Sequence, residues 1–163
     1  MHDQLVVPVD KLVGTVGRER KFQGERSVSL RLGEVIVDGP MNVSGVLVGT
    51  TEGVDSSFRA VALANLVCTR CLLEWSEEVE ATGSQYFRTE PDEDGYGIVD
   101  NAVDVGAPAQ DELALSLPAV PICRPGCAGL CPTCGTDLNR DPCDGHGDDS
   151  DSPFAVLKDL FDS

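Results

Sequence analysis

The residues of this sequence with the clearest chemistry are seven cysteines and one histidine, because thiolates and imidazoles bind transition metals. Cys68 and Cys71 form one Cys-x-x-Cys pair, and Cys131 and Cys134 form another. Such a pair on a tight turn aims two thiolates at one point. Cys127 follows Cys123 at Cys-x-x-x-Cys spacing, and His146 follows Cys143 at Cys-x-x-His spacing. Together these spacings predict structural zinc sites.

Eight ligands suit two closed tetrahedral zinc sites. In the grouping that we favour, Cys68 and Cys71 join Cys123 and Cys127, and a second set consists of Cys131, Cys134, Cys143 and His146. The alternative grouping places Cys123, Cys127, Cys131 and Cys134 at one site, within twelve residues of sequence, and leaves the other four ligands for the second. Neither grouping leaves a coordination position open for water, so both predict structural metal rather than catalytic metal.

Three other interpretations of these residues stay open. Cys68 and Cys71 are also spaced like a redox dithiol, although that motif usually opens a helix and the residues after Cys71 are typical of a strand. Four thiolates can bind an iron–sulfur cluster in place of zinc. His146 lies in an acidic loop and can be an ordinary solvated histidine.

The charge of the chain is strongly acidic and unevenly distributed. Twelve basic residues face 28 acidic ones, which gives a net charge of −16. Residues 89–163 carry −13 of this charge and residues 1–88 only −3. Because affinity for nucleic acids comes mostly from lysine and arginine that displace counterions, the acidic part argues against free-standing nucleic-acid binding. It favours a basic protein partner instead.

Residues 11–31 are the most basic stretch of the chain, with six basic side chains against Glu19 and Glu25. Two interpretations of this stretch are open. It is either a solvated loop or a contact for RNA phosphates, for which the candidate side chains are Arg18, Arg20, Lys21 and Arg26.

No feature of the sequence indicates a catalytic or a secreted protein. The chain begins with Met1-His2-Asp3-Gln4 and has no run of about 18 apolar residues, so we expect no signal peptide, no membrane contact and a cytoplasmic location. Neither a glycine-rich phosphate loop nor a nucleophile with a base is evident. We therefore expect a protein that is not an enzyme and has no small-molecule substrate.

The elements that must position the cysteines are mostly strands. Glycine and proline together make up 27 of the 163 residues, which favours turns over long helices. Alternating patterns predict strands at 5–9, 28–37, 41–50, 59–67, 78–87 and 98–105, with a turn at 38–40, a bulge at 44–45 and a turn-like segment at 51–57. Residues 59–67 are apolar on both faces, which predicts a central strand. Four long strands in succession predict an antiparallel meander.

Two helices are expected beside this sheet. Residues 107–117 have Pro108 near the start and end before Pro118, which favours a short helix, although the leucines at 113, 115 and 117 also fit a strand. Ser152 and Pro153 are typical of a helix start, and a core-packing stripe follows at Phe154, Leu157, Leu160 and Phe161. The sequence thus predicts one α+β domain over 1–163. It consists of a sheet-rich part (1–117), a zinc-binding segment (118–146), and an acidic connector with a terminal helix (147–163).

Several motifs in this order resemble one bacterial protein family. Cys68-Thr69-Arg70-Cys71-Leu72 comes first, followed by Leu113 to Pro118, Cys123, the block Gly129 to Asn139, and Pro153 to Leu157. Their order and spacing resemble the YceD family, the large ribosomal RNA subunit accumulation proteins. The resemblance covers nearly the whole chain, although the first 60 residues match only in strand pattern. Many members have Cys-x-Cys where this chain has Cys143-Asp144-Gly145, and many have an arginine where this chain has Phe154.

The resemblance implies a non-enzymatic factor that supports large-subunit ribosomal RNA accumulation, in processing or assembly. Its expected partners are ribosomal RNA or a basic large-subunit ribosomal protein. A general zinc-stabilised adaptor without a ribosomal role is the alternative function, and a thiol redox protein is a third.

Overall fold

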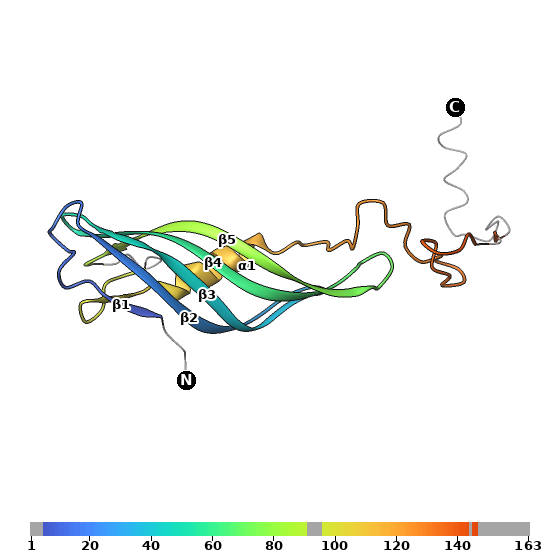
Figure 1. Ribbon diagram of the computed structural model, residues 1–163, viewed down its shortest axis with the longest axis horizontal. Helices are drawn as coiled ribbons and strands as arrows, with labels where there is room; N and C mark the ends of the chain where they lie inside the picture. Colours follow the sequence, from blue (N-terminus) through green and yellow to red (C-terminus); the bar gives the residue numbers. More distant parts are fainter. Residues whose placement is uncertain (1–4, 91–95, 144, 147–163) are drawn as a thin grey trace, which may run out of the picture.

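A long antiparallel sheet dominates the structure, a computed structural model that describes residues 5–90, 96–143 and 145–146 (Figure 1). In chain order the elements are β1 (Val6–Pro8), β2 (Glu19–Leu32), β3 (Val35–Gly49), β4 (Gly53–Val67), β5 (Glu74–Arg88), β6 (Ala102–Asp104) and α1 (Gly106–Ser116). Strands β2 to β5 form one sheet in sequence order, and β1 pairs with β6 in a second, two-stranded sheet. Every pairing between these strands is antiparallel, so the predicted meander is confirmed.

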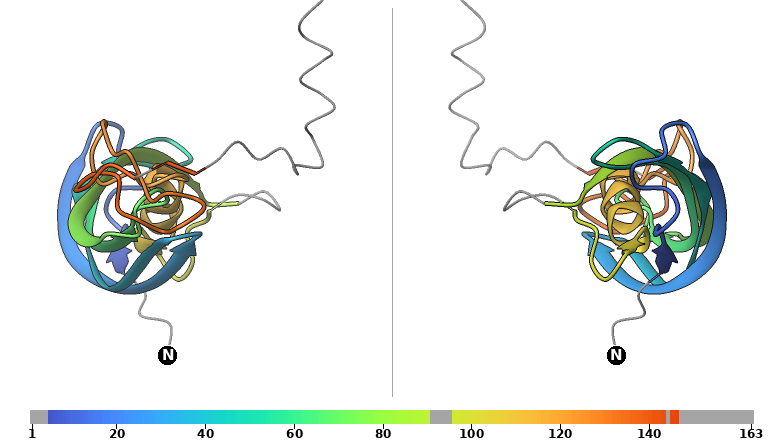
Figure 2. Two further views of the ribbon diagram at one scale, coloured as in Figure 1. Left: turned by 90° about the vertical axis from the view of Figure 1, so that its right-hand side faces the viewer. Right: turned by 90° about the vertical axis from the view of Figure 1, so that its left-hand side faces the viewer.

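Side chains alternate along each long strand between the protein core and solvent. In β4, for example, Phe58, Ala60 and Ala62 are buried, while Arg59 and Leu63 are exposed. The sheet curls around α1, as the end-on views of Figure 2 show, so that its inner face encloses the helix. The strand predicted at 59–67 is central in the sheet, but only one of its faces is buried, because no second layer covers the outer face in the described part of the chain.

Two groups of buried side chains fill the interior. The first lies between the sheet and α1, where Ala109 and Leu113 of the helix, and Leu117 directly after it, pack against residues such as Met41 and Leu66. The second lies near β1 and β6 and includes Val9, Leu47, Val54, Phe87 and Val103. The short helix predicted at 107–117 is confirmed within one residue at its start, and it ends where Leu117 becomes extended before Pro118.

Several local predictions about the strands are wrong. The turn between the first two long strands lies at Gly33 and Glu34, where Gly33 has a φ of 55°, and residues 38–40 lie inside β3. The irregular pairing lies between Ile36 and Met41, not at 44–45. Residues 53–57 belong to β4 rather than to a turn. Gly39 and Pro40 are residue types that usually indicate a turn, which explains the wrong prediction. In the structure the register shift in β3 accommodates both of them within the strand.

The basic stretch is not a loop throughout, because β2 begins at Glu19. Strand β6 covers only three of the eight residues predicted at 98–105. The predicted terminal helix lies outside the described residues. Within the described part of the chain, no helix is long and apolar enough to cross a membrane. From α1 the chain runs along the long axis of the molecule to the cysteine-rich segment beyond the β4–β5 turn (Figure 1).

Candidate metal centres

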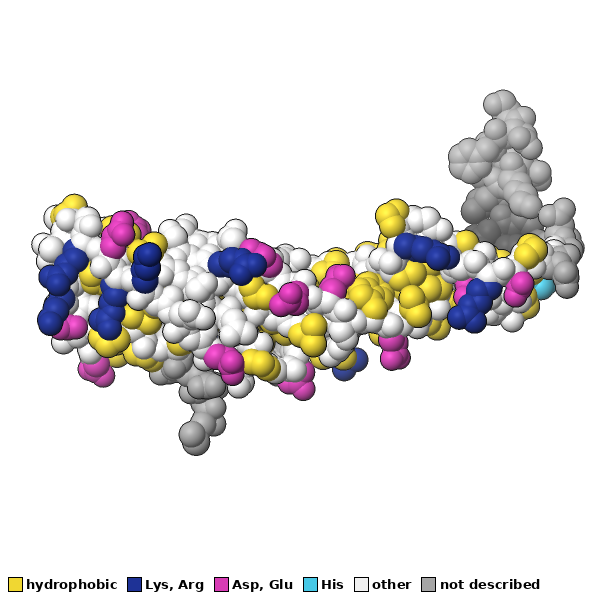
Figure 3. All heavy atoms as spheres, in the orientation of Figure 1, with side chains coloured by type: hydrophobic (Ala, Val, Ile, Leu, Met, Phe, Trp, Pro, Cys, Tyr) yellow, Lys and Arg dark blue, Asp and Glu magenta, His cyan; other side chains and the backbone are white. Residues whose placement is uncertain are grey.

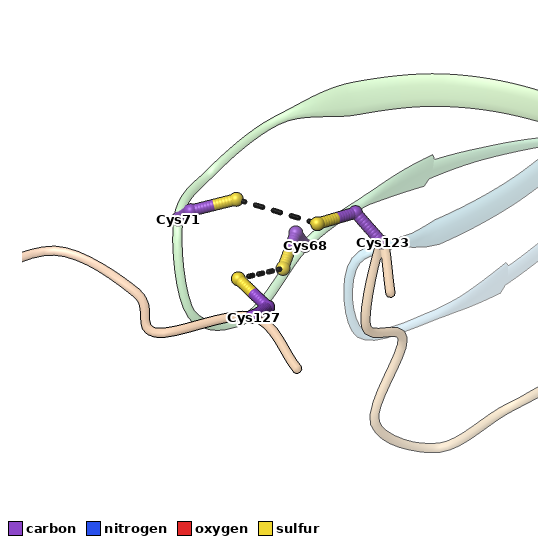
Figure 4. A group of neighbouring side chains, drawn as sticks. All are labelled: Cys68, Cys71, Cys123 and Cys127. Atoms are coloured by element: carbon purple, nitrogen blue, oxygen red, sulfur yellow. Dashed lines mark hydrogen bonds between the residues drawn. The ribbon is translucent and has the colours of Figure 1, made fainter. Parts of the chain in front are cut away.

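The first cysteine cluster joins the β4–β5 hairpin to the segment that follows α1. Cys68 and Cys71 lie in the turn between the two strands, and Cys123 and Cys127 come from the later segment (Figure 4). The Sγ atoms of Cys71 and Cys123 are 3.6 Å apart, and those of Cys68 and Cys127 are 3.9 Å apart. All four sulfurs lie within 4.8 Å of one another. Tetrahedral zinc with bonds of about 2.3 Å needs sulfurs roughly 3.8 Å apart, so the cluster has the size of a ZnS₄ site.

Backbone hydrogen bonds hold the turn that carries Cys68 and Cys71. The amide of Cys68 donates to the carbonyl of Leu73 at 2.8 Å, and the amide of Leu72 donates to the carbonyl of Cys68 at 2.9 Å. Leu72 adopts a φ of 59°, a left-handed conformation that leucine rarely adopts. This conformation turns the chain tightly enough for both thiols to face the same point.

Further bonds fix the later segment against this turn. The amide of Thr69 donates to the carbonyl of Pro121 at 3.0 Å. The Nη1 of Arg70 donates to the carbonyl of Cys127 at 2.9 Å. These bonds are made to Pro121 and Cys127, at the two ends of the segment that carries Cys123 and Cys127. Contacts of the polypeptide itself therefore hold this segment against the Cys68–Cys71 turn.

The second cluster lies within one short segment of chain. Its ligand atoms belong to Cys131, Cys134, Cys143 and His146, and they also lie within 4.8 Å of one another. The Nε2 of His146 is 3.2 Å from the Sγ of Cys131 and 3.0 Å from that of Cys143. The turn that aims Cys131 and Cys134 inward is closed by the amide of Gly135, which donates to the carbonyl of Cys131 at 2.8 Å, and Gly135 has a φ of 74°.

A short connection ties the second cluster to the first. The amide of Leu130 donates to the carbonyl of Arg70 at 3.0 Å. Asn139 bridges the two clusters, since its Oδ1 accepts from the amide of Ala128 at 2.9 Å and its Nδ2 donates to the Sγ of Cys127 at 3.6 Å. The two clusters therefore form one unit at the end of the hairpin.

The clusters differ in exposure. Cys68 and Cys127 of the first cluster are buried and its other two cysteines are half-buried, whereas Cys134 of the second cluster is exposed. Burial acts to raise the pKa of Cys68, but hydrogen bonds from the backbone amides of Cys123, Cys71 and Arg70 lower it to about 6. Burial and the neighbouring thiols raise the pKa of Cys123 to about 12. Four crowded sulfurs cannot all ionise together unless a cation balances them, which is the chemistry of a metal site.

In the second cluster, the hydroxyl and amide of Thr136 lower the pKa of Cys134 to about 6. The sulfurs of Cys134 and Cys131 raise the pKa of His146. Hydrogen bonds from the backbone of Cys134 and Thr133 lower the pKa of Cys131 as well. Each cluster thus has at least one easily ionised sulfur, and each brings four metal-binding atoms close together. The structure groups the eight residues as our favoured grouping predicts, and it separates Cys123 and Cys127 from Cys131 and Cys134, which the alternative would have joined.

The four basic residues predicted to contact RNA do not form one surface. Arg18 precedes β2, and Arg20 and Lys21 lie at the beginning of that strand; all three are exposed. The Nη1 of Arg20 donates to the carbonyl of Pro8 at 2.8 Å. Arg26 is largely buried, with 14% of its side chain exposed, and its Nη1 is 3.0 Å from the Oδ2 of Asp104. Its charge is therefore already neutralised inside the fold.

Reasoning from the sequence placed Lys11 in the basic stretch but did not name it among the four candidate RNA contacts, and it assigned no role to Arg70. Lys11 lines a hollow of about 160 Å³ together with Arg18 and Arg20, at the end of the molecule remote from the cysteines. Figure 3 shows lysine and arginine side chains gathered at that left-hand end. Arg70 holds the two parts of the first cluster together, because its Nη1 donates a hydrogen bond to the carbonyl of Cys127. Only its position inside the Cys-x-x-Cys pair could have pointed to that role.

Comparisons with known proteins agree with these motifs. Residues 57–161 match the family model of the large ribosomal RNA subunit accumulation protein YceD. An uncharacterized protein of Mycobacterium tuberculosis is 38% identical over 84 residues, which cover 46% of this chain and 40% of that protein. An uncharacterized protein of Mycobacterium leprae is 30% identical over 143 residues, which cover 82% of this chain and 65% of that protein. The chain thus matches between two fifths and two thirds of the length of these curated relatives. No solved structure matches the chain.

Proposed function

Because this chain belongs to the YceD family of large ribosomal RNA subunit accumulation proteins, we propose that it is a non-enzymatic factor that supports large-subunit ribosomal RNA during ribosome assembly. The observation that carries this proposal is the family match over residues 57–161, which contains both cysteine clusters and most of the hairpin that presents them. The protein would act by binding, since we assign no catalytic residue.

Two zinc ions complete the proposed functional form. Zinc suits both clusters, because three or four thiolates with an optional imidazole are its usual structural ligands. Zinc in the first cluster would hold the cysteine-rich segment against the β4–β5 hairpin. Zinc in the second would fix the loop between Cys131 and His146. In this form the metal end of the molecule is a rigid surface for a partner.

The charge distribution supports the binding of different partners by different parts of the molecule. Lys11, Arg18 and Arg20 line a small hollow at one end together with Leu12 and Glu19, and the next residue along the chain, Lys21, is exposed. We assign RNA phosphate contact to this end. The remainder of the chain is strongly acidic and is better suited to a basic ribosomal protein.

The proposed role can be tested in cells that lack the gene. We expect the ratio of large-subunit to small-subunit ribosomal RNA to fall, and a plasmid copy of the gene to restore it. A copy with Cys71→Ser should restore it poorly, because the first metal site would be incomplete. An unchanged ratio, together with a pull-down free of ribosomal components, would favour the general adaptor instead.

Direct RNA contact can be tested by the salt dependence of binding. Affinity for a single-stranded RNA fragment is measured at several salt concentrations. In the triple variant Arg18→Ala, Arg20→Ala and Lys21→Ala, the slope of log affinity against log salt should be less negative by about 2. A matched control removes three positive charges elsewhere, from Arg31, Arg59 and Arg88. Equal slopes for the two triple variants would remove the assignment of RNA to this end and leave the family role to a protein contact.

A further inference from the structure

An apolar surface that none of the other described residues covers lies beside the first cluster. Leu72 and Leu73, at the tip of the β4–β5 hairpin, are 62% and 54% exposed. They line a hollow of about 490 Å³ together with Arg124, Asp137 and Arg140 from the cysteine-rich segment. Figure 3 shows hydrophobic side chains gathered beside Lys or Arg towards the metal end of the molecule. Two adjacent exposed leucines on a rigid turn are typical of a contact surface.

We propose that the C-terminal segment of this chain, Pro153 to Phe161, docks into this hollow, which we call the tip hollow, through the apolar face formed by Phe154, Leu157, Leu160 and Phe161. These four side chains recur at helical spacing, so one face of a helix would present all of them. A helix with such a face is stable in water only when that face is covered.

The length of the chain makes this contact local. The described chain ends at His146, which is held in the second cluster, and six residues separate His146 from Pro153. Six extended residues span roughly 20 Å. The second cluster is itself anchored to the hairpin tip through the bond from Leu130 to Arg70. A tether this short gives the segment a high effective concentration at the tip, so even a small apolar contact would be populated.

The charges distinguish the tip hollow from a neighbouring one. Residues 147–163 contain five aspartates and one lysine, a net charge of −4. The second hollow, of about 390 Å³ beside Trp75, is flanked by Glu34 and Glu74 and has no basic residue in its lining. In the tip hollow, Arg124 and Arg140 offset two of the three negative charges that Asp137 and a zinc-bound first cluster (−2) would carry, which leaves −1. The second hollow keeps −2 with no cation in its lining, so it repels an acidic segment more strongly than the tip hollow does.

Arg124 and Arg140 have hydrogen-bond donors that could bind aspartates of the docked segment. Arg140 is 81% exposed, and its Nε lies 3.4 Å from Asp137, a long contact that leaves most of the guanidinium to solvent. The Nη2 of Arg124 donates a hydrogen bond to the Oδ1 of Asn139 at 2.7 Å, and that side chain is neutral. Asp159 and Asp162 are next to Leu160 and Phe161 in the sequence, so docking of the segment would bring two carboxylates near these arginines. The family match also ends at residue 161, so the hairpin tip and the docking segment belong to the same matched unit.

The test uses the full zinc-supplemented chain and amide NMR spectra. Leu157→Asp in the segment should shift the amide signals of Leu72, Leu73 and Arg140 by more than a line width. Ala155→Asp is the matched control, because it adds the same charge on the opposite side of the expected helix. It should leave those three signals in place.

The reciprocal variant tests the same contact from the other side. Leu73→Asp should make the signals of residues 153–161 resemble those of a free chain, with sharply reduced heteronuclear Overhauser effects. Leu115→Asp, at a position on α1 that is 80% exposed, should not. Unchanged signals in both reciprocal experiments would overturn the proposal. Signals of Leu72 and Leu73 that respond to protein concentration and not to Leu157→Asp would also overturn it, in favour of a second copy of the chain.

Discussion

The Sγ atoms of Cys71 and Cys123 lie 3.6 Å apart, although 52 residues separate them in the sequence. In the second cluster, the Sγ atoms of Cys134 and Cys143 are 3.7 Å apart across only nine residues. The two clusters therefore constrain the chain differently. A metal ion in the first one closes a long loop that contains β5, β6 and α1, whereas a metal ion in the second closes a local loop.

This difference predicts unequal effects of losing each metal site. The variants Cys71→Ser and Cys134→Ser should each bind one zinc per chain, where the wild type binds two. Because an open 52-residue loop gains more entropy than an open nine-residue loop, Cys71→Ser should have the lower melting temperature, by roughly 5 °C. Elemental analysis and thermal unfolding of the three proteins measure both effects. Equal melting temperatures for the two variants would show that the first cluster does not hold the hairpin to the later segment.

Metal-binding motifs whose residues lie close together in the sequence could be predicted. Contacts between residues that are far apart in the sequence could not. The two Cys-x-x-Cys turns and the pairing of Cys143 with His146 are local patterns, and the meander made the approach of Cys68 to Cys123 a reasonable expectation. The contacts of Arg70 and Asn139 were not predictable, because each depends on a backbone group that folding brings near.

The strand boundaries show the same limit. Alternation predicts the buried face of β5 correctly, but residues 59–67 of β4 are apolar on both faces, so the sequence does not show which face is buried. The residue types at Asp38-Gly39-Pro40 predict a turn, yet these residues lie inside β3. In the structure, β3 has two more residues than β4 between Met41 and Ile36, so the register absorbs the glycine and the proline. Arg26 was assigned to RNA because its partner, Asp104, lies 78 residues away.

The pairing of Arg26 with Asp104 predicts a stabilising role for both residues. Asp104 also accepts a hydrogen bond from the amide of Gly106, at 3.0 Å, and so fixes the start of α1 beside β2. Arg26→Ala should lower the free energy of unfolding by about 1–3 kcal/mol, because it leaves a largely buried carboxylate without its cation. Chemical denaturation measures this loss.

A double-mutant cycle separates this interaction from simple loss of packing. Combined with Asp104→Asn, Arg26→Ala should cost less than the sum of the two single changes. Arg59→Ala is the control, because Arg59 and Glu80 form an ion pair on the exposed outer face of the sheet. We expect no measurable loss from that change. Additive costs for Arg26 and Asp104 would contradict the coupling.

Gly49 allows the loop that carries Lys11 and Arg18 to pack against the end of β3. A Cβ atom at this position would lie 2.2 Å from the carbonyl oxygen of Leu12 and 2.5 Å from that of Thr15. Its amide donates to the carbonyl of Arg18 at 2.8 Å. Gly49→Ala should therefore destabilise the protein by about 2–3 kcal/mol and disturb the basic hollow. Gly126→Ala, where a Cβ meets no atom within 4 Å, should change stability by less than about 0.5 kcal/mol in the same denaturation experiment.

Tyr96 predicts a loss of stability in strong alkali. Partial burial, together with the carboxylate of Asp111 that accepts its hydroxyl hydrogen bond, raises the pKa of Tyr96 to about 12. An unfolded tyrosine has a pKa of about 10. Between these two values the unfolded chain releases a proton that the folded chain keeps, so the contribution of Tyr96 to stability is present below pH 10 and is lost as the pH rises to about 12.

Absorbance of the tyrosinate in a Tyr86→Phe background follows this group alone, because the chain has two tyrosines. The folded protein should titrate near pH 12, and Asp111→Asn should bring the pKa of Tyr96 closer to 10, because the neutral amide no longer repels the phenolate. Glu112→Gln removes the same charge from the neighbouring position and serves as the control. If Asp111→Asn and Glu112→Gln shift the titration equally, the hydrogen bond from Tyr96 to Asp111 does not set this pKa.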